Sequence, residues 1–166
     1  MITGVIAAAV VVRFLLPTAG APEPCNMLNA AEIAAALGSA PSPGKPRGPD
    51  LDQESGAKVW TCTREVGTAI LVVSLAELPT PAAAGRALDT LAMMTAESGE
   101  DELVPKLKEE PGLGDRAMSG ASSIGAIWAV VRGRHMLSLS LSGEGIDGPR
   151  YREPLKRLTT RALSKI

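Results

Sequence analysis

Few residues of this sequence have the types and spacing that covalent or acid–base chemistry requires. Cys25 and Cys62 are its only cysteines, and His135 is its only histidine. Two cysteines of an exported chain most often pair with each other, and the alternative is two free thiols. No neighbouring pattern lowers the pKa of either thiol, so a catalytic cysteine is not expected. One histidine and a bridged cysteine pair also leave too few ligands for a zinc site, and we expect no metal or cofactor.

His135 and Asp115 are the remaining candidates for catalysis. His135 is in phase with Leu137 and Leu139 in an alternating segment, which favours a partly buried histidine at the edge of a strand. A general base would also need a nucleophile and an orienting carboxylate nearby. A hydrolase using Asp115 and His135 therefore requires the two side chains to lie within hydrogen-bond reach in one pocket. We assign no catalytic residue.

Asp115 ends a glycine-rich turn, 112–115, that could bind phosphate. No helix start follows these residues, so the dipole of a helix cannot help to hold an anion there. A turn with positive φ at Gly112 or Gly114 is the simpler interpretation, with the Asp115 carboxylate bonded to amides nearby.

Two tryptophans, Trp60 and Trp128, fall on expected strands. Tryptophan on a strand more often fills a core than binds a ligand. A tryptophan exposed beside an apolar groove would be the best ligand contact. Together with Asp115 and His135, they form the set of possible ligand-binding residues.

The composition limits the possible partners. Hydrophobic residues make up 45% of the 166 residues, aromatic residues only 2%, and the net charge is −1. Few aromatics and no excess of positive charge argue against nucleic acid as a partner. The segment 150–165 carries six basic residues and one acid, which could attract anionic lipid or an acidic protein. The alternative is a solvated helix face.

The N-terminal residues resemble an export signal. The segment 4–16 is apolar except for Arg13, and small residues follow it, which predicts a signal peptide over 1–20 cleaved after Gly20. No basic residue precedes the apolar core, and an upstream start codon would explain this. A retained N-terminal anchor is the alternative, and membrane tethering would be possible only through such an uncleaved N-terminus. The remaining residues, 25–166, are expected to form one exported domain in the periplasm or outside the cell.

The elements are predicted from periodicity and caps. A helix begins after Asn29 and ends at Gly38, and residues 39–56 form an exposed, poorly ordered loop. A strand follows at 57–64, and the apolar run 68–78 is typical of a strand covered on both faces. A helix runs from Pro81 to about residue 98, with Thr80 as its N-terminal cap. A short edge strand is possible at 104–107 and another strand at 116–118.

The clearest signal lies near the C-terminus. Residues 124–132 and 135–141 form a β-hairpin around 133–134, with its leucines on a buried face and its serines on a wet face. A final helix spans 151–166. The fold class is therefore α+β: an antiparallel sheet of about five strands, helices packed against it, the order α-β-β-α-β-β-(β)-α, and one disulfide.

Three short motifs resemble small exported bacterial domains of unknown function. The segment 25–38 is similar to the opening "C-x-L-L-x-x-x-E-V-x-x-x-L-G" of those domains. Those domains also carry a second cysteine followed by a strand, which the segment Trp60-Thr61-Cys62 resembles, and residues 112–117 match their "G-L-G-D-x-A" turn. The resemblance spans about 25–165 and implies a PsbP-like sandwich of helices on a sheet. The chain lacks the lipobox of many of these domains.

These observations predict a non-enzymatic exported domain of the cell envelope. It would bind a protein partner or a small apolar ligand, because no set of acid, base and nucleophile is visible. Besides the hydrolase, a purely structural envelope component is an alternative. Such a component would have no sizeable pocket, and an exposed apolar patch would serve assembly.

Overall fold

The computed structural model describes residues 22–97 and 103–166. This part of the chain contains four helices and seven strands. The helices are α1 (Pro24–Met27), α2 (Ala30–Leu37), α3 (Pro81–Glu97) and α4 (Gly148–Leu163). The strands are β1 (Lys45–Leu51), β2 (Lys58–Val66), β3 (Ala69–Glu77), β4 (Lys108–Glu109), β5 (Arg116–Ser122), β6 (Gly125–Arg132) and β7 (His135–Gly143).

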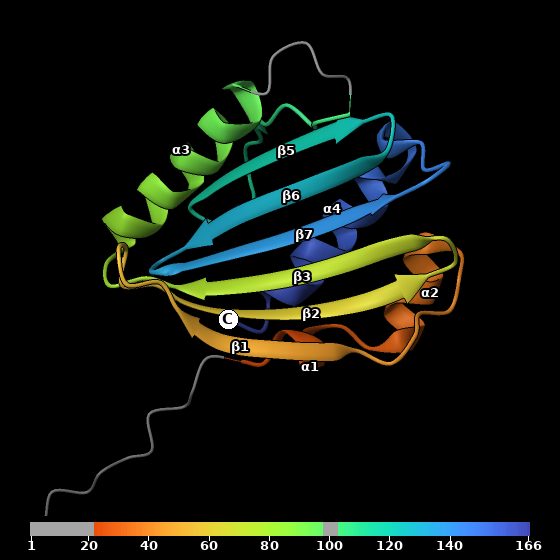
Figure 1. Ribbon diagram of the computed structural model, residues 1–166, viewed down its shortest axis with the longest axis horizontal. Helices are drawn as coiled ribbons and strands as arrows, with labels where there is room; N and C mark the ends of the chain where they lie inside the picture. Colours follow the sequence, from red (N-terminus) through yellow and green to blue (C-terminus); the bar gives the residue numbers. More distant parts are fainter. Residues whose placement is uncertain (1–21, 98–102) are drawn as a thin grey trace, which may run out of the picture.

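All seven strands form one antiparallel sheet in the order β1-β2-β3-β7-β6-β5-β4 (Figure 1). The hairpins β2–β3 and β6–β7 lie side by side, joined by the pairing of β3 with β7. The predicted hairpin of 124–132 with 135–141 is confirmed. The antiparallel α+β class with one disulfide is also confirmed.

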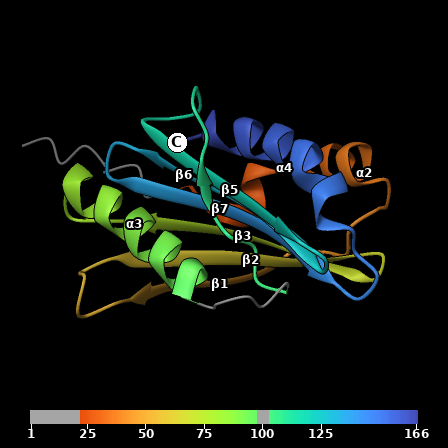
Figure 2. The same cartoon turned by 90° about the horizontal axis from the view of Figure 1, so that it is seen from above.

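Helices cover the two faces of the sheet unequally. Helices α2 and α4 lie side by side on one face, while α3 lies on the other (Figure 2). The larger apolar core fills the space under α1, α2 and α4, with leucines of β3 and β7 at its centre. The smaller core lies under α3 and joins it to β5, β6 and β7. One face of the sheet is therefore sealed, and the other is covered only in part.

Local sequence signals explain where α2 and α3 begin and end. The Asn29 side chain accepts a hydrogen bond from the backbone N–H of Glu32, and the Glu32 carboxylate accepts one from the N–H of Asn29. Gly38 ends α2 with φ of 81°, a backbone conformation that favours glycine. Thr80 Oγ accepts from the N–H of Ala83 at the start of α3. These predicted caps are confirmed.

The predicted disulfide joins Cys25 of α1 to Cys62 of β2, with a Cα–Cα distance of 5.0 Å. Gly44 lies against it, since a Cβ at that position would be 2.7 Å from both sulfur atoms. The Arg64 guanidinium donates to the carbonyls of Cys25 and Ser42, so it holds the segments on both sides of the bridge. The disulfide therefore attaches α1 to the sealed face of the sheet.

The predicted number of strands and order of helices were wrong. Residues 39–56 are not a plain loop, because β1 forms within them and pairs with β2. This strand was missed because Pro46 and Pro49 are typical of a loop. Prolines are nevertheless tolerated in an edge strand, whose outer N–H groups need no partner in the sheet. Helix α1 was also missed because it has only four residues. The expected edge strand at 104–107 lies instead at Lys108–Glu109, and the final helix begins at Gly148.

A second correction concerns the apolar run 68–78. Strand β3 forms there as predicted, but it is fully covered on one face only, and on the other face Ala76 alone is buried, in the core under α3. Leu71, Val73 and Leu75 are buried under the helices, while Ile70 on the opposite face is 45% exposed. The continuous apolar run predicted a strand that is covered on both faces. Ile70 and Val72 instead lie on the incompletely covered face.

The predicted signal peptide, its alternative as an anchor and the cleavage site lie outside the described residues. In the part of the chain that the structure describes, no helix combines the length and apolar character needed to cross a membrane.

Candidate ligand-binding site

A strip of small polar side chains crosses the sheet on its incompletely covered side. Residues on paired strands that lie opposite each other point to the same face, and Thr61 is opposite Ser74, which is opposite Ser138. The next row contains Thr63, Val72 and Ser140. We call this surface the open face and define it by these six partly exposed residues: Thr61, Thr63, Val72, Ser74, Ser138 and Ser140.

The hydroxyls of the open face have no partners within the described parts of the chain. None of the five forms a side-chain hydrogen bond there, and none is a buried unsatisfied group. Each hydroxyl can donate one hydrogen bond and accept two. The open face therefore offers a row of donors and acceptors that only solvent or a ligand can use.

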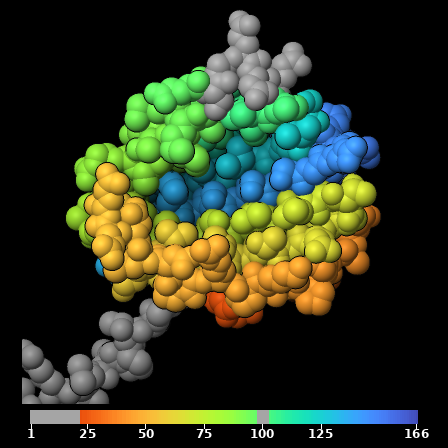
Figure 3. Space-filling model, in the orientation of Figure 1, coloured from red at the N-terminus to blue at the C-terminus, as the bar shows by residue number. Residues whose placement is uncertain are grey.

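The open face lies at the bottom of a hollow. In Figure 3, α3 in green and β1 in orange form raised rims, with blue atoms of β7 between them. Several charged side chains at these rims are paired. Lys45 bonds to Glu65 at 3.3 Å, Arg47 to Asp50 at 3.0 Å, and Arg116 of β5 to Asp89 of α3 at 2.9 Å. The Arg116 guanidinium lowers the pKa of the Asp89 carboxyl, which keeps that pair ionised.

One end of the open face continues into an apolar hollow of about 230 Å³. It lies where α3 ends and where the β5–β6 turn meets β7. Ser140 belongs to both the open face and this end hollow. Among the described residues, no charged side chain lines it; the lining residues are Thr95, Leu103, Pro105, Ser122, Ile124, Gly125, Ala126, Ile127, Ser140, Leu141 and Ser142.

Sequence reasoning missed this site, although part of its signal was visible. The wet face of the β7 hairpin, with Ser138 and Ser140, is confirmed. The contribution of β3 was missed because Ile70 and Val72 were expected to be covered. The residues that line the end hollow come from several elements between Thr95 and Ser142. No local sequence pattern predicts that these elements lie together.

Trp128 is a core residue. It is 1% exposed, and its Nε1 donates to the carbonyl of Arg152 in α4 at 2.9 Å. The Lys156 ammonium lies 5.4 Å from the centre of its ring. These contacts attach α4 to β6, so Trp128 does not face the open side.

Trp60 shares the helix-covered side of β2 with Cys62 and is partly exposed. Residues of one strand alternate between faces, so Trp60 points away from Thr61 and from the open face. It does not line the end hollow. That it contacts a ligand stays a prediction, and nothing brings it together with the residues described above.

The structure does not join Asp115 to His135. Asp115 accepts a hydrogen bond at 2.6 Å from the N–H of Gly133, which fixes the β6–β7 turn. His135 begins β7 beside that turn, and burial lowers its pKa, partly offset by the Glu77 carboxylate. Within the described residues no hydrogen bond connects the two side chains. The arrangement needed by the hydrolase alternative is therefore absent from this part of the chain.

The turn before Asp115 has the predicted geometry. Gly112 and Gly114 both have positive φ, 84° and 64°. A Cβ at Gly114 would lie 2.5 Å from the Val131 carbonyl oxygen. Glycine is needed here for backbone packing, which supports the turn rather than a phosphate site.

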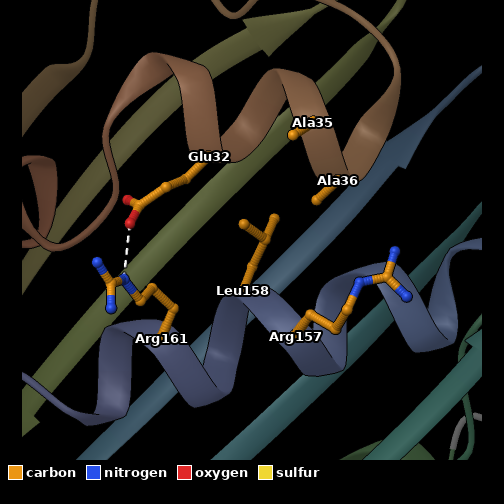
Figure 4. Close-up of a pocket in the computed structure, with 6 residues that line it drawn as sticks. All are labelled: Glu32, Ala35, Ala36, Arg157, Leu158 and Arg161. Carbon is orange, nitrogen blue, oxygen red and sulfur yellow. Dashed lines mark hydrogen bonds and ion pairs between the residues drawn. The ribbon is translucent and has the colours of Figure 1, made fainter.

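A separate shallow hollow of about 260 Å³ lies between α2 and α4 (Figure 4). Leu158, Ala35 and Ala36 line it, and Arg161 Nε bonds to Glu32 Oε1 across it at 2.7 Å. The Asn29 backbone N–H and then Arg161 lower the pKa of the Glu32 carboxyl. This hollow is a seam between packed helices, closed by an ion pair.

Several basic residues of the segment 150–165 are engaged in such contacts. Arg152 bonds to Glu110 and Ser119, and Lys165 Nζ donates to the Asn26 carbonyl. These bonds favour a structural role for much of the positive charge. No group of three or more histidine, cysteine or acidic residues that could hold a metal ion occurs among the described residues.

The geometry defines the chain as an α+β domain with one sealed and one open sheet face. Among solved structures, it is similar to the crystal structure of the extracellular domain of PknH from Mycobacterium tuberculosis. The TM-score is 0.60 with 12% sequence identity, covering 83% of this chain and 91% of the other. At that identity the likeness shows the shared fold alone. The Cys25–Cys62 disulfide itself fits an exported protein, because disulfides persist in oxidising compartments.

No family model matches the chain, and no curated protein matches it. The resemblance to exported bacterial domains with a PsbP-like fold therefore stays a prediction.

Proposed function

We propose that this chain is a non-enzymatic exported domain that binds a small ligand of the cell envelope on its open face. The observation that carries the proposal is the set of five hydroxyls without partners, which form two rows across three strands beside an apolar hollow. Ligand sites combine apolar walls with a few polar groups that fix orientation, and this surface has both.

The contrast between the two faces of the sheet supports this proposal. The sealed face is closed by α1, α2 and α4, and its largest side chains are fully buried. Next to the open face, on the same side of the sheet, Ile70 remains exposed. Exposed apolar groups in a hollow mark binding surfaces more often than scattered surface residues do.

An exported location is part of the proposal. The chain contains the Cys25–Cys62 disulfide. Disulfides persist in oxidising compartments and are rare in the cytosol. The fold is shared with an extracellular domain. Whether the chain resides in the periplasm or is released does not affect the binding proposal.

Native mass spectrometry of the full chain, incubated with an organic extract of the host cell envelope, tests the proposal. We expect the chain to retain a compound of defined mass. Ser74→Trp, which places a large side chain in the centre of the open face, should abolish retention. Thr90→Trp, on an exposed position of α3, is the matched control and should retain it. Retention unaffected by Ser74→Trp, or no specific retention, would contradict the proposal.

A further inference from the structure

We infer that the end hollow binds the alkyl chain of a single-chain amphiphile whose polar head is uncharged. This inference rests on the proposed function and adds the class of ligand. The inference is based on the contact between the polar open face and the apolar end hollow. Ser140 belongs to the open face and also lines the end hollow.

The size of the hollow points to one chain. A dry apolar cavity of about 150 Å³ accommodates benzene, whereas sites for drug-sized ligands begin at about 300 Å³. At about 230 Å³ the end hollow is between these values. A flexible alkyl segment fits this volume better than a fused ring system or a pair of acyl chains.

The walls of the hollow are suited to methylene groups. Ile127 of β6 and Ile124 of the β5–β6 turn contribute branched apolar side chains, and Ile124 is 38% exposed. Pro105 adds a further apolar surface. An alkyl chain placed here would remove these side chains from water, which is the main source of apolar binding energy.

Charge complementarity indicates an uncharged head. The open face carries hydroxyls and one valine, and the rim cations Lys45 and Arg47 are each bonded to a carboxylate. A carboxylate or phosphate head would have no unpaired cation among these groups, and it would lose water without compensation. A head rich in hydroxyls can instead exchange hydrogen bonds with Ser138 and Ser140.

The test uses the full chain with 13C-labelled isoleucine methyl groups and 1-decanoylglycerol as the probe, below its aggregation concentration. We expect NMR shifts at Ile124 and Ile127, with Ile33 and Ile146, in the core of the sealed face, unchanged. Shorter monoacylglycerols should bind more weakly, by roughly fourfold for each methylene removed, until the chain no longer fills the hollow. Glycerol should not bind detectably, and decanoate should bind less tightly than 1-decanoylglycerol.

Ile124→Gln should weaken binding of 1-decanoylglycerol about tenfold or more. Leu51→Gln replaces another exposed apolar residue, at the end of β1, and is the matched control that should leave binding unchanged. No binding of any monoacylglycerol would overturn the inference, as would decanoate binding as tightly as the neutral probe. Shifts at Ile70 without shifts at Ile124 and Ile127 would also overturn it, while the proposed function, tested by the envelope extract, would stand.

Discussion

Ser74 lies directly opposite Ser138 across the β3–β7 pair, on the face of the sheet that points away from α4. The strands β3 and β7 belong to different hairpins, so this pairing exists only in the folded domain. Neither hydroxyl bonds to another described residue. The meeting of the two hairpins therefore creates a polar surface at the centre of the sheet, and this is the surface that we propose for ligand binding.

Removing the disulfide should destabilise the domain without altering the open face. The bridge joins residues 37 apart on the sealed side of the sheet. For a loop of this size, the double change Cys25→Ser and Cys62→Ser should lower the free energy of unfolding by roughly 3–4 kcal/mol, mainly by freeing the unfolded chain. Urea unfolding measures the loss. A difference near zero between the wild-type protein and the double variant would contradict a stabilising role of the bridge.

Gly44→Ala should destabilise the domain, because the new methyl group would lie 2.7 Å from both bridge sulfurs. Overpacking of this kind costs about 1–3 kcal/mol. Gly85→Ala, within α3, is the matched control: its methyl group would have no neighbour closer than 3.9 Å, apart from its own helix backbone and chain neighbours. It should stabilise the domain by about 1 kcal/mol, since alanine favours a helix. Thermal unfolding should therefore shift in opposite directions, and equal shifts would contradict this packing.

Trp128→Phe should destabilise the domain, because the Arg152 carbonyl would lose the hydrogen bond from the indole N–H. A hydrogen bond of this kind contributes about 0.5–1.5 kcal/mol. Trp60→Phe is the control: Trp60 is partly exposed and forms no side-chain hydrogen bond among the described residues, so it should change stability less. Guanidinium unfolding compares the two variants. Ligand binding lost in Trp128→Phe without a loss of stability would assign this residue to the site.

The domain should lose stability as the pH falls from 7.5 to 5.5, in part because of His135. Burial lowers its pKa in the folded state below the ordinary value of 6.5. The unfolded chain then takes up the proton at higher pH, so the stabilising contribution is complete above about pH 6.5 and is lost as pH falls through the lowered pKa. His135→Gln should flatten the pH dependence of the urea midpoint over this range. An unchanged slope would show that His135 does not contribute to it.

The sequence predicted the elements whose signals are local. These signals depend only on residues nearby in the sequence: the caps Asn29 and Thr80, the left-handed Gly38 and the alternating serines of β7. The predictions made from them were confirmed. Strand β1 was missed because its prolines resemble a loop, and only pairing with β2 makes it a strand. Local signals cannot reveal such a partner.

The candidate site was harder to predict than the fold. The residues singled out for their chemistry, Trp128 and Asp115, hold structural contacts. The open face is built from serine, threonine and valine, residue types with no distinctive motif. Besides the wet serines of β7, the sequence offered the apolar Ile70 and Val72 of β3, which were taken as evidence of full burial. Whether a strand is covered on its second face depends on where α3 packs, and the sequence of the strand does not contain that information.

A crystal structure of the full chain bound to the compound retained from the envelope extract tests the central claim most directly. We predict ligand density over β2, β3 and β7, with polar atoms within hydrogen-bond distance of Ser74 and Ser138. Density for the compound in the seam between α2 and α4, with the open face unoccupied, would contradict the account.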